Sequence, residues 1–137
     1  MRIEFQRLGR HNLPLPEIAG EQGLTVELRA CIPEGVVRIP PGARVSIGTG
    51  FALRLPSSHA ALLVPCSARA PRHGLVIANP MAVIPAEPGR EVHVRFRHQR
   101  PEGEPLRIAH GTRIARLLIV ERVRRSAALH RRGIRLR

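Results

Sequence analysis

The side chains in this chain that could carry out chemistry are restricted in type. All ten acidic residues are Glu, all 23 basic residues are Arg, and the 137 residues include no Asp, Tyr or Lys. The use of Arg in place of Lys could reflect codon bias, but codon bias does not explain the loss of every Asp. A reaction that depends on an Asp as general base therefore lacks that group in this chain.

Two neighbouring side chains, Cys66 and Ser67, could act as nucleophiles. A nucleophile of this kind needs a base beside it and a group that orients the base, and the sequence places no His and carboxylate next to this pair. Cys66 could instead form a disulfide with Cys31. The N-terminal segment is charged and has no apolar run typical of a signal peptide, so we expect a cytoplasmic protein with free thiols.

The net charge of +13 is unevenly distributed. Residues 1–121 carry 16 Arg and ten Glu, whereas the segment from Arg122 onward carries seven Arg and no acidic residue. Such a tail usually stays mobile and attracts polyanions, although it can also be a solvated segment without a partner. With three Phe and no Tyr or Trp, contact with nucleic acid would rest on phosphates rather than on stacked bases, and salt would weaken it.

The elements that position these residues are predicted to be short strands bounded by Gly and Pro. Alternation and β-branched content mark the segments 24–29, 36–39, 44–47, 51–55, 60–64, 74–78, 91–98, 106–108 and 113–123. Segment 60–64 is apolar throughout, which is typical of a strand buried on both faces. Segment 91–98 should place His93, Arg95 and Arg97 on one face and apolar residues on the other.

The chain as a whole is predicted to be all-β. No segment shows a helical stripe, turn signals recur about every ten residues, and the longest apolar runs are far shorter than a membrane span. We therefore expect a sandwich or jelly roll in one domain at residues 1–123, a basic tail at 124–137 and no membrane segment.

Four stretches, in this order, are similar to those of the trimeric dUTPase family: LTVELRA, IPPGARVSIGTGFALRLP, LLVPCSARAPRHGLVIANPMAVIPAEPGREVHV and GTRIARLLIV. The similarity covers about residues 13–123. It implies a jelly-roll-like β-barrel of the β-clip type that forms a homotrimer, with active sites at the subunit interfaces. Each site would bind a deoxyuridine nucleotide with magnesium on its phosphates and convert dUTP and water into dUMP and pyrophosphate.

In the first stretch, the resemblance implies a carboxylate that helps to hold the hydrated metal. The family usually has Asp in an Asp-Leu-x-Ala pattern, where this chain has Glu27. Because magnesium demands tight octahedral geometry, Glu27 with its extra methylene is a displaced candidate ligand. The alternative is an ordinary strand Glu paired with an Arg.

In the next motif, the resemblance implies an Arg and a Ser that bind phosphates. Ser67 is retained, but Cys66 replaces the Arg. Arg69 and Arg72 follow closely, and either is a candidate to reach back to a phosphate. The alternative is that both are ordinary surface arginines.

The third stretch resembles the family hairpin that binds uracil, in which Asn79 and Ile84 would contact the nucleotide. Pro85 stands where the family has the Asp that activates water. Proline has no proton acceptor on its side chain, so it cannot act as a general base. Glu87 lies two residues further on the same face of a strand and is a candidate substitute base. Pro88 replaces a Tyr that would pack against the deoxyribose.

The fourth stretch is preserved except that Arg116 replaces the usual Gln, which adds a charge suited to an anion. The family's Gly-rich C-terminal arm with an aromatic residue is replaced by an Arg-rich tail, which supplies no aromatic cover for a nucleotide. The related dCTP deaminases would need a catalytic Glu at 92–97, and this chain has no acidic residue there.

Three hypotheses follow from these observations. The first is a catalytically degenerate homologue that retains binding of a nucleotide or another anion. The second is a divergent dUTP diphosphatase that works with magnesium, Glu27 and Glu87. The third is a structural or interaction trimer whose basic surface binds a polyanion.

Overall fold

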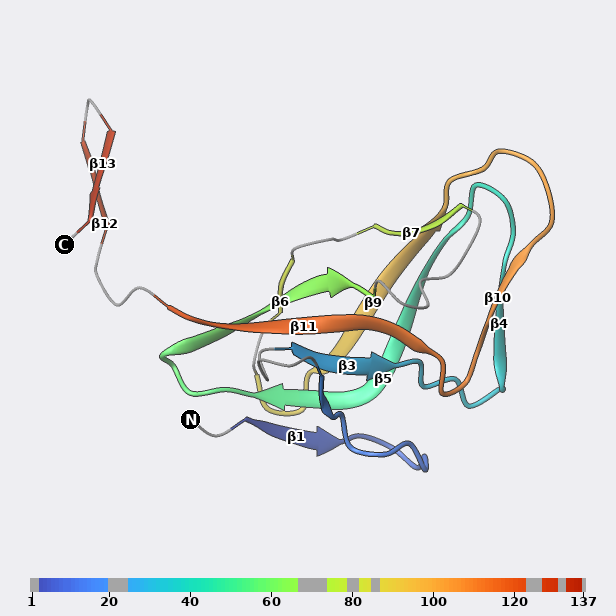
Figure 1. The fold of residues 1–137 in the computed structure, drawn as a ribbon, viewed down its shortest axis with the longest axis horizontal. Coiled ribbons are helices and arrows are strands. Elements are labelled where there is room, and N and C mark those ends of the chain that lie inside the picture. The colour runs from blue at the N-terminus through green and yellow to red at the C-terminus, as the bar shows by residue number, and fades with distance from the viewer. Residues whose placement is uncertain are drawn as a thin grey trace.

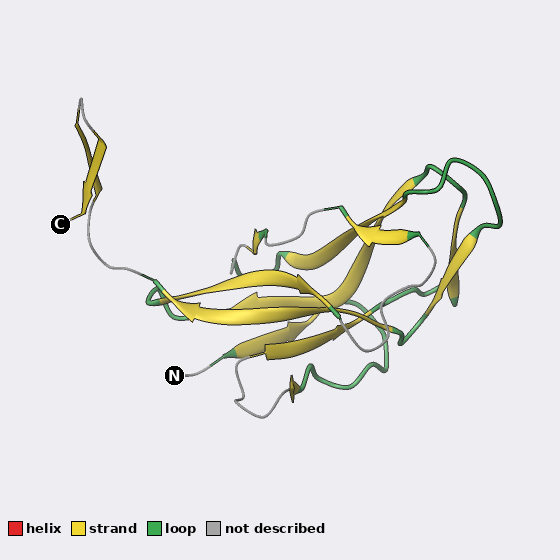
Figure 2. Cartoon of the chain, turned by 45° about the horizontal axis from the view of Figure 1, so that its top comes forward, coloured by secondary structure: helices red, strands yellow, loops and turns green. Residues whose placement is uncertain are grey.

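The computed structural model of this chain describes residues 3–19, 25–66, 74–78, 82–84, 87–122, 127–130 and 133–136. The strands are β1 (Glu4–Arg7), β2 (Ile18–Ala19), β3 (Thr25–Arg29), β4 (Val36–Ile39), β5 (Arg44–Arg54), β6 (His59–Pro65), β7 (Leu75–Ile77), β8 (Val83–Ile84), β9 (Glu91–His98), β10 (Leu106–Ala109), β11 (Arg113–Glu121), β12 (Ala127–His130) and β13 (Gly133–Leu136). These described ranges hold strands but no helix, which confirms the all-β prediction (Figure 2). None of them therefore contains a helix able to span a membrane.

Two sheets enclose the hydrophobic core (Figure 1). One has the strand order β1-β5-β9-β7, and the other has the order β2-β3-β11-β6-β8. Leu53 and Phe96 of the first sheet and Leu28, Leu63 and Leu117 of the second are fully buried between them. Beyond the turn at 40–43, β4 pairs with β10 as a separate two-stranded ribbon.

β5 is longer than expected, because segments 44–47 and 51–55 merge into one strand. The pairing of β5 with β9 shifts register between Gly48 and Ala52. Gly50 adopts a φ of 76°, a conformation that side chains rarely allow. The Thr49 hydroxyl donates to the carbonyl oxygen of Val92 at 2.8 Å. This irregularity keeps both halves of the strand in the same sheet.

The predicted alternation of β9 is confirmed. His93, Arg95 and Arg97 are exposed, while Val94 and Phe96 are fully buried. Every second residue of this strand therefore faces away from the core.

The expectation that segment 60–64 is buried on both faces is wrong. Ala61 and Leu63 are fully buried, but Leu62 and Val64 are only half-buried. β6 thus has one face in the core and one face outside it. The outer face is apolar even though the described chain does not cover it.

Several strands were not predicted, namely β1, β2, β8, β12 and β13. β12 and β13 pair with each other inside the basic tail. Figure 1 shows this hairpin standing apart from the two sheets. β8 is only two residues long and pairs with β6. Such short strands carry too few residues for a periodic signal.

Candidate functional site

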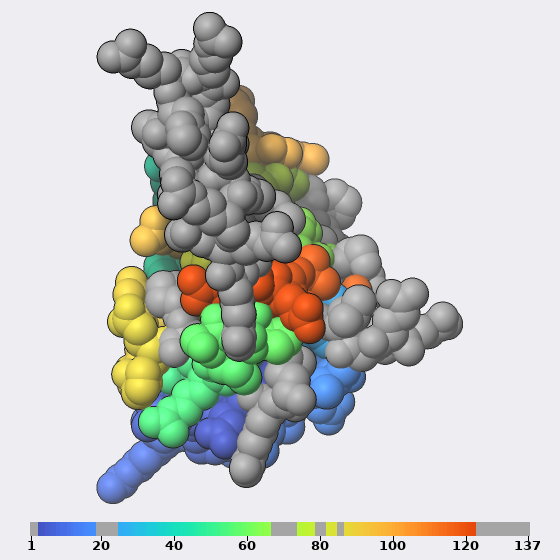
Figure 3. Space-filling model, turned by 90° about the vertical axis from the view of Figure 1, so that its left-hand side faces the viewer, coloured from blue at the N-terminus to red at the C-terminus, as the bar shows by residue number. Residues whose placement is uncertain are grey.

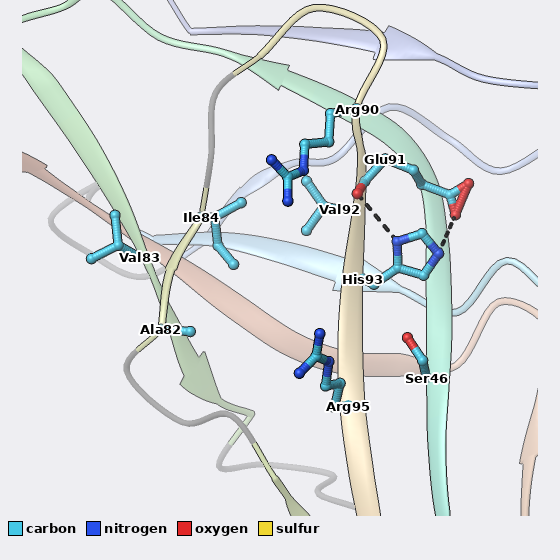
Figure 4. A pocket seen from close by; sticks show the side chains of 9 residues that line it. All are labelled: Ser46, Ala82, Val83, Ile84, Arg90, Glu91, Val92, His93 and Arg95. Carbon is cyan, nitrogen blue, oxygen red and sulfur yellow. Dashed lines mark hydrogen bonds and ion pairs between the residues drawn. The ribbon is translucent and has the colours of Figure 1, made fainter.

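A cavity of about 510 Å³ lies between β8 and β9, and most of its lining residues belong to the third of the similar stretches. We call it the β8–β9 hollow. It is lined by Ser46, Ala82, Val83, Ile84, Arg90, Glu91, Val92, His93 and Arg95 (Figure 4). Ile84, one of the predicted nucleotide contacts, is buried on the β8 side of this hollow.

The β9 side of the hollow is cationic. Figure 4 shows the side chains of Arg90 and Arg95 extending from this side toward β8. Guanidinium groups only donate hydrogen bonds and stay charged at all ordinary pH values. This side of the hollow therefore suits a ligand that is rich in acceptor oxygens.

Glu91 is a carboxylate of the hollow that the sequence alone did not single out. Its Oε2 lies 3.4 Å from Nε2 of His93, and Nδ1 of His93 lies 3.2 Å from the Glu91 carbonyl oxygen. A Cβ on residue 48 would collide with the Glu91 carboxylate, so Gly48 lets this side chain lie against β5. Figure 4 shows Glu91 turned away from Ile84. In the sequence, the feature that could have indicated a close contact of this kind was Gly48 in β5, the strand that pairs with β9.

Glu27 lies between two arginines of the neighbouring strand. Its Oε2 is 3.0 Å from Nε of Arg113, and its Oε1 is 3.5 Å from a terminal nitrogen of Arg116. The Glu27 side chain is 17% exposed, so both ion pairs are partly shielded from water. We call these three residues the Glu27 cluster. The structure thus brings together two of the predicted site residues, Glu27 and Arg116.

A β-bulge makes this arrangement feasible. In a regular strand, residues 113 and 116 would face opposite sides of the sheet. In β11, the pairing with β3 shifts between Arg113 and Ala115, and Ile114 and Ala115 both face the core. The extra residue returns Arg113 to the outer face, where Arg116 pairs directly across from Glu27.

The described residues do not fit a magnesium site at Glu27. Magnesium requires oxygen ligands in nearly ideal octahedral geometry, whereas both oxygens of Glu27 already face guanidinium groups. Across the described ranges, no group of three or more His, Cys, Asp or Glu side chains is placed to hold an ion.

Glu87, the candidate substitute base, is exposed in the turn before β9. One carboxylate oxygen lies 3.4 Å from a terminal nitrogen of Arg90. Glu87 is not among the residues that line the β8–β9 hollow. The other predicted site positions, Ser67, Arg69, Arg72, Asn79 and Pro85, lie outside the described residues.

A second cavity, of about 490 Å³, includes Arg10, His11, Cys31 and His110 in its lining. Burial and the nearby Glu91 carboxylate raise the pKa of the Cys31 thiol, and Arg7 opposes this shift. The amide N–H of Ile32 donates to Nδ1 of His110 at 2.9 Å. Both cysteines, Cys31 and Cys66, are free thiols, as expected.

Comparison with known proteins shows what this chain is similar to. The family model described as dUTPase matches residues 27–133. The deoxyuridine 5'-triphosphate nucleotidohydrolase of Thermobifida fusca is 35% identical over 127 residues, which cover 93% of this chain and 68% of the relative. The enzyme of the same name from Methylococcus capsulatus is 36% identical over 121 residues, covering 88% of this chain and 78% of the relative.

Solved structures share the fold. A mutant dUTPase from phage phi11 of S. aureus, described with a structural Mg(II) ion, superposes with a TM-score of 0.75 and 16% identity. The superposition covers 96% of this chain and 97% of that chain. A mutant of the phage 80alpha dUTPase with dUpNHpp gives a TM-score of 0.73 and 19% identity, covering 95% and 96%. These likenesses confirm the predicted fold.

Proposed function

Because this chain belongs to the dUTPase family, we propose that it retains nucleotide binding and has lost most of the family's hydrolysis. The observation that carries this proposal is the Glu27 cluster, in which two arginines occupy the carboxylate that the resemblance assigns to the metal. The sequence adds that Pro85 replaces the expected base. Loss of a general base typically slows a reaction by about 10²–10⁴-fold.

The β8–β9 hollow supports the binding half of the proposal. It lies in the hairpin that the resemblance assigns to uracil, and it combines apolar residues of β8 with the guanidinium groups of Arg90 and Arg95. Pockets that bind small molecules usually pair an apolar lining with a few polar groups that fix the ligand. A deoxyuridine nucleotide presents both an apolar ring face and acceptor oxygens.

Two measurements test this proposal. Pyrophosphate release from dUTP with magnesium should be near background, and the non-hydrolysable analogue dUpNHpp should raise the melting temperature of the protein. A ligand at 100 times its dissociation constant adds about 2.7 kcal/mol to the free energy of unfolding. Rapid pyrophosphate release would contradict the loss of hydrolysis, and an unchanged melting temperature would contradict binding.

The second hypothesis, a working dUTP diphosphatase, is favoured by the relatives that carry this activity in their names. It would need Glu87 or another carboxylate to activate water. Glu87 is exposed and held by Arg90, outside the lining of the hollow. We therefore favour the degenerate homologue, and the assay of pyrophosphate release separates the two.

The outer face of the five-stranded sheet supports the proposal that three copies of the chain assemble. Leu118, Leu62 and Val83 lie directly opposite one another on β11, β6 and β8 and form an apolar row on this face. Val83 is 66% exposed. Contiguous apolar surface of this kind usually marks a protein interface. Figure 3 shows β6 and β11 at adjacent positions on the molecular surface.

The third hypothesis, a surface that binds a polyanion, is favoured by arginines that face each other across strand pairs. Arg38 pairs with Arg107 between β4 and β10, and Arg44 pairs with Arg97 between β5 and β9. Like charges directly opposite are destabilising. Within the described part of the chain, none of these four has an ion-pair partner. The phosphate backbone of duplex nucleic acid would offset their repulsion.

Binding of duplex DNA at low salt tests this surface. Charge reversal by Arg38→Glu with Arg107→Glu should weaken binding and flatten its dependence on salt, as should deletion of residues 124–137. Arg54→Gln removes a charge that is already paired with Glu4 at 3.9 Å and serves as the control. Binding that survives both changes would contradict the proposed contact.

A further inference from the structure

The Glu27 cluster carries more positive charge than its own carboxylate neutralises. Arg113 and Arg116 both approach Glu27, and Arg29 lies directly across from Arg113. The Arg29 guanidinium donates to the carbonyl oxygen of Gly111 at 2.9 Å, which fixes its position beside the bulge. One carboxylate thus contacts two guanidinium groups, and a third arginine lies next to this pair on the same two strands.

One donor of the cluster is unused. The Nε of Arg116 is buried and has no hydrogen-bond partner among the described residues. A buried donor without an acceptor costs free energy, and native structures usually avoid it. The side chains of Arg113 and Arg116 nevertheless remain 42% and 26% exposed, so an oxyanion from outside the chain can reach the surplus positive charge of the cluster.

We propose that the Glu27 cluster is an oxyanion site that binds the phosphate chain of a nucleotide without a metal ion. Arginine suits this task because its planar fork of donors matches the oxygens of a phosphate. In this chain, guanidinium groups neutralise the phosphates directly, in the place where the resemblance leads one to expect a carboxylate that shares a magnesium ion. This inference rests on the proposed function, since the base of the nucleotide would lie in the β8–β9 hollow.

The position of the cluster agrees with a site shared between subunits. Within one chain, β11 and β6 separate Glu27 from β8. The pair of Glu27 and Arg116 lies two residues along β3 and β11 from the pair of Thr25 and Leu118, in the same outer face. Leu118 belongs to the apolar row through which we propose that the chains assemble. Assembly through this row would bring the cluster of one subunit beside its neighbour, which would supply the hollow.

Calorimetric titration of the 137-residue protein with inorganic triphosphate, in EDTA and in magnesium, tests the site. Triphosphate should bind in EDTA, and magnesium should not strengthen its binding. Arg116→Gln should weaken binding by roughly tenfold, because it removes charged hydrogen bonds. Arg54→Gln, which removes one paired charge from the other sheet, is the matched control and should leave the affinity unchanged.

Glu27→Gln separates an oxyanion site from a metal site. If Glu27 competes with the anion for the two arginines, the variant should bind triphosphate several-fold more tightly in EDTA. If Glu27 holds a metal, the variant should bind triphosphate more weakly than the unaltered protein does, and this loss of affinity should appear only in magnesium. The second result would overturn the inference, as would magnesium-dependent binding by the unaltered protein. Thermal melts of each variant establish that it is folded.

A parallel titration with dUpNHpp distinguishes the proposed nucleotide binding from the proposed oxyanion site. If dUpNHpp binds more tightly than triphosphate, and both lose affinity in Arg116→Gln, both proposals hold. If the two ligands bind with equal affinity, the β8–β9 hollow contributes nothing to the affinity for dUpNHpp. This result would contradict the proposed nucleotide binding but not the oxyanion site. If dUpNHpp binds well but Arg116→Gln changes nothing, the oxyanion site fails alone.

Discussion

A carboxylate acts as a general base only when one of its oxygens is open to a water molecule that faces the substrate. Glu87 does not meet this condition, because its exposed carboxylate contacts Arg90 and does not line the β8–β9 hollow. Glu27 does not meet it either, because both of its oxygens face arginines. Glu91, the carboxylate that lines the hollow, lies against Gly48 and beside His93.

We therefore expect Glu87→Gln to leave the low rate of pyrophosphate release from dUTP unchanged within about twofold. Pro85→Asp alone should not restore the full activity of the family, because Cys66 and Pro88 also replace functional groups that the resemblance assigns. Steady-state assays of both variants at saturating magnesium provide the check. Robust turnover by the unaltered protein that Glu87→Gln abolishes would show that Glu87 is the base.

The raised pKa of Cys31 predicts how stability depends on alkaline pH. In the unfolded chain, the thiol ionises near its ordinary value of 9.0, whereas burial and Glu91 delay ionisation in the folded chain. The stability from this group is therefore complete below pH 9 and declines as the pH rises through the raised value. With no Tyr or Lys in the chain, few other groups titrate in this window.

Urea unfolding at pH 8 and pH 10 measures this effect. The unaltered protein should lose more free energy of unfolding between the two pH values than Cys31→Ser does, because serine does not ionise there. An equal loss in both proteins would show that Cys31 has the same pKa in the folded and unfolded chain.

At the scale of single elements, the irregular part of β5 depends on a glycine with a positive φ. Gly50 and Gly42 both have a φ of 76°, but they differ in surroundings. A Cβ at Gly50 would lie 2.5 Å from Nε2 of His11 and 3.0 Å from Sγ of Cys31, while nothing lies within 4 Å of one at Gly42. In addition, His11 Nε2 lies 2.9 Å from the Gly50 carbonyl oxygen.

Gly42→Ala should therefore lower the free energy of unfolding by about 1–2 kcal/mol, the cost of a left-handed backbone with a side chain. Gly50→Ala should cost more, because it must also displace His11 and Cys31. Urea unfolding measures the loss in free energy of unfolding for each variant. The difference between the two losses is the cost of displacing His11 and Cys31, apart from the cost of the backbone conformation. Equal losses would mean that His11 and Cys31 move aside freely.

The strands show which parts of the fold the sequence could predict. β9 has eight residues in clear alternation, so its faces were predicted correctly. β6 was misjudged because an apolar residue on an outer face looks the same in the sequence as one in the core. The Glu27 cluster depends on a bulge in β11, and a shift of register between two strands leaves no periodic signal in either of them.

At the scale of the whole molecule, the apolar row predicts assembly. Light scattering should give about three times 15.2 kDa for the unaltered protein. Leu118→Arg should shift the mass toward the monomer, because it places a charge at one end of the row, directly opposite Leu62. Leu15→Arg changes a residue that is 58% exposed and lies outside the row, so it should leave the mass unchanged. A monomeric unaltered protein would remove the basis for a shared site.

The bulge in β11 also has a consequence for how the gene can change. Loss of one codon from 116 to 120 would exchange the inner and outer faces for the rest of the strand, since side chains alternate with a period of two. Loss of the codon for Ile114 would instead remove the bulge and give regular pairing between β11 and β3. Arg113, Arg116 and Leu118 would still lie on the outer face. Within β11, a single-residue deletion at the bulge therefore keeps the buried residues in the core and the exposed residues on the outer face.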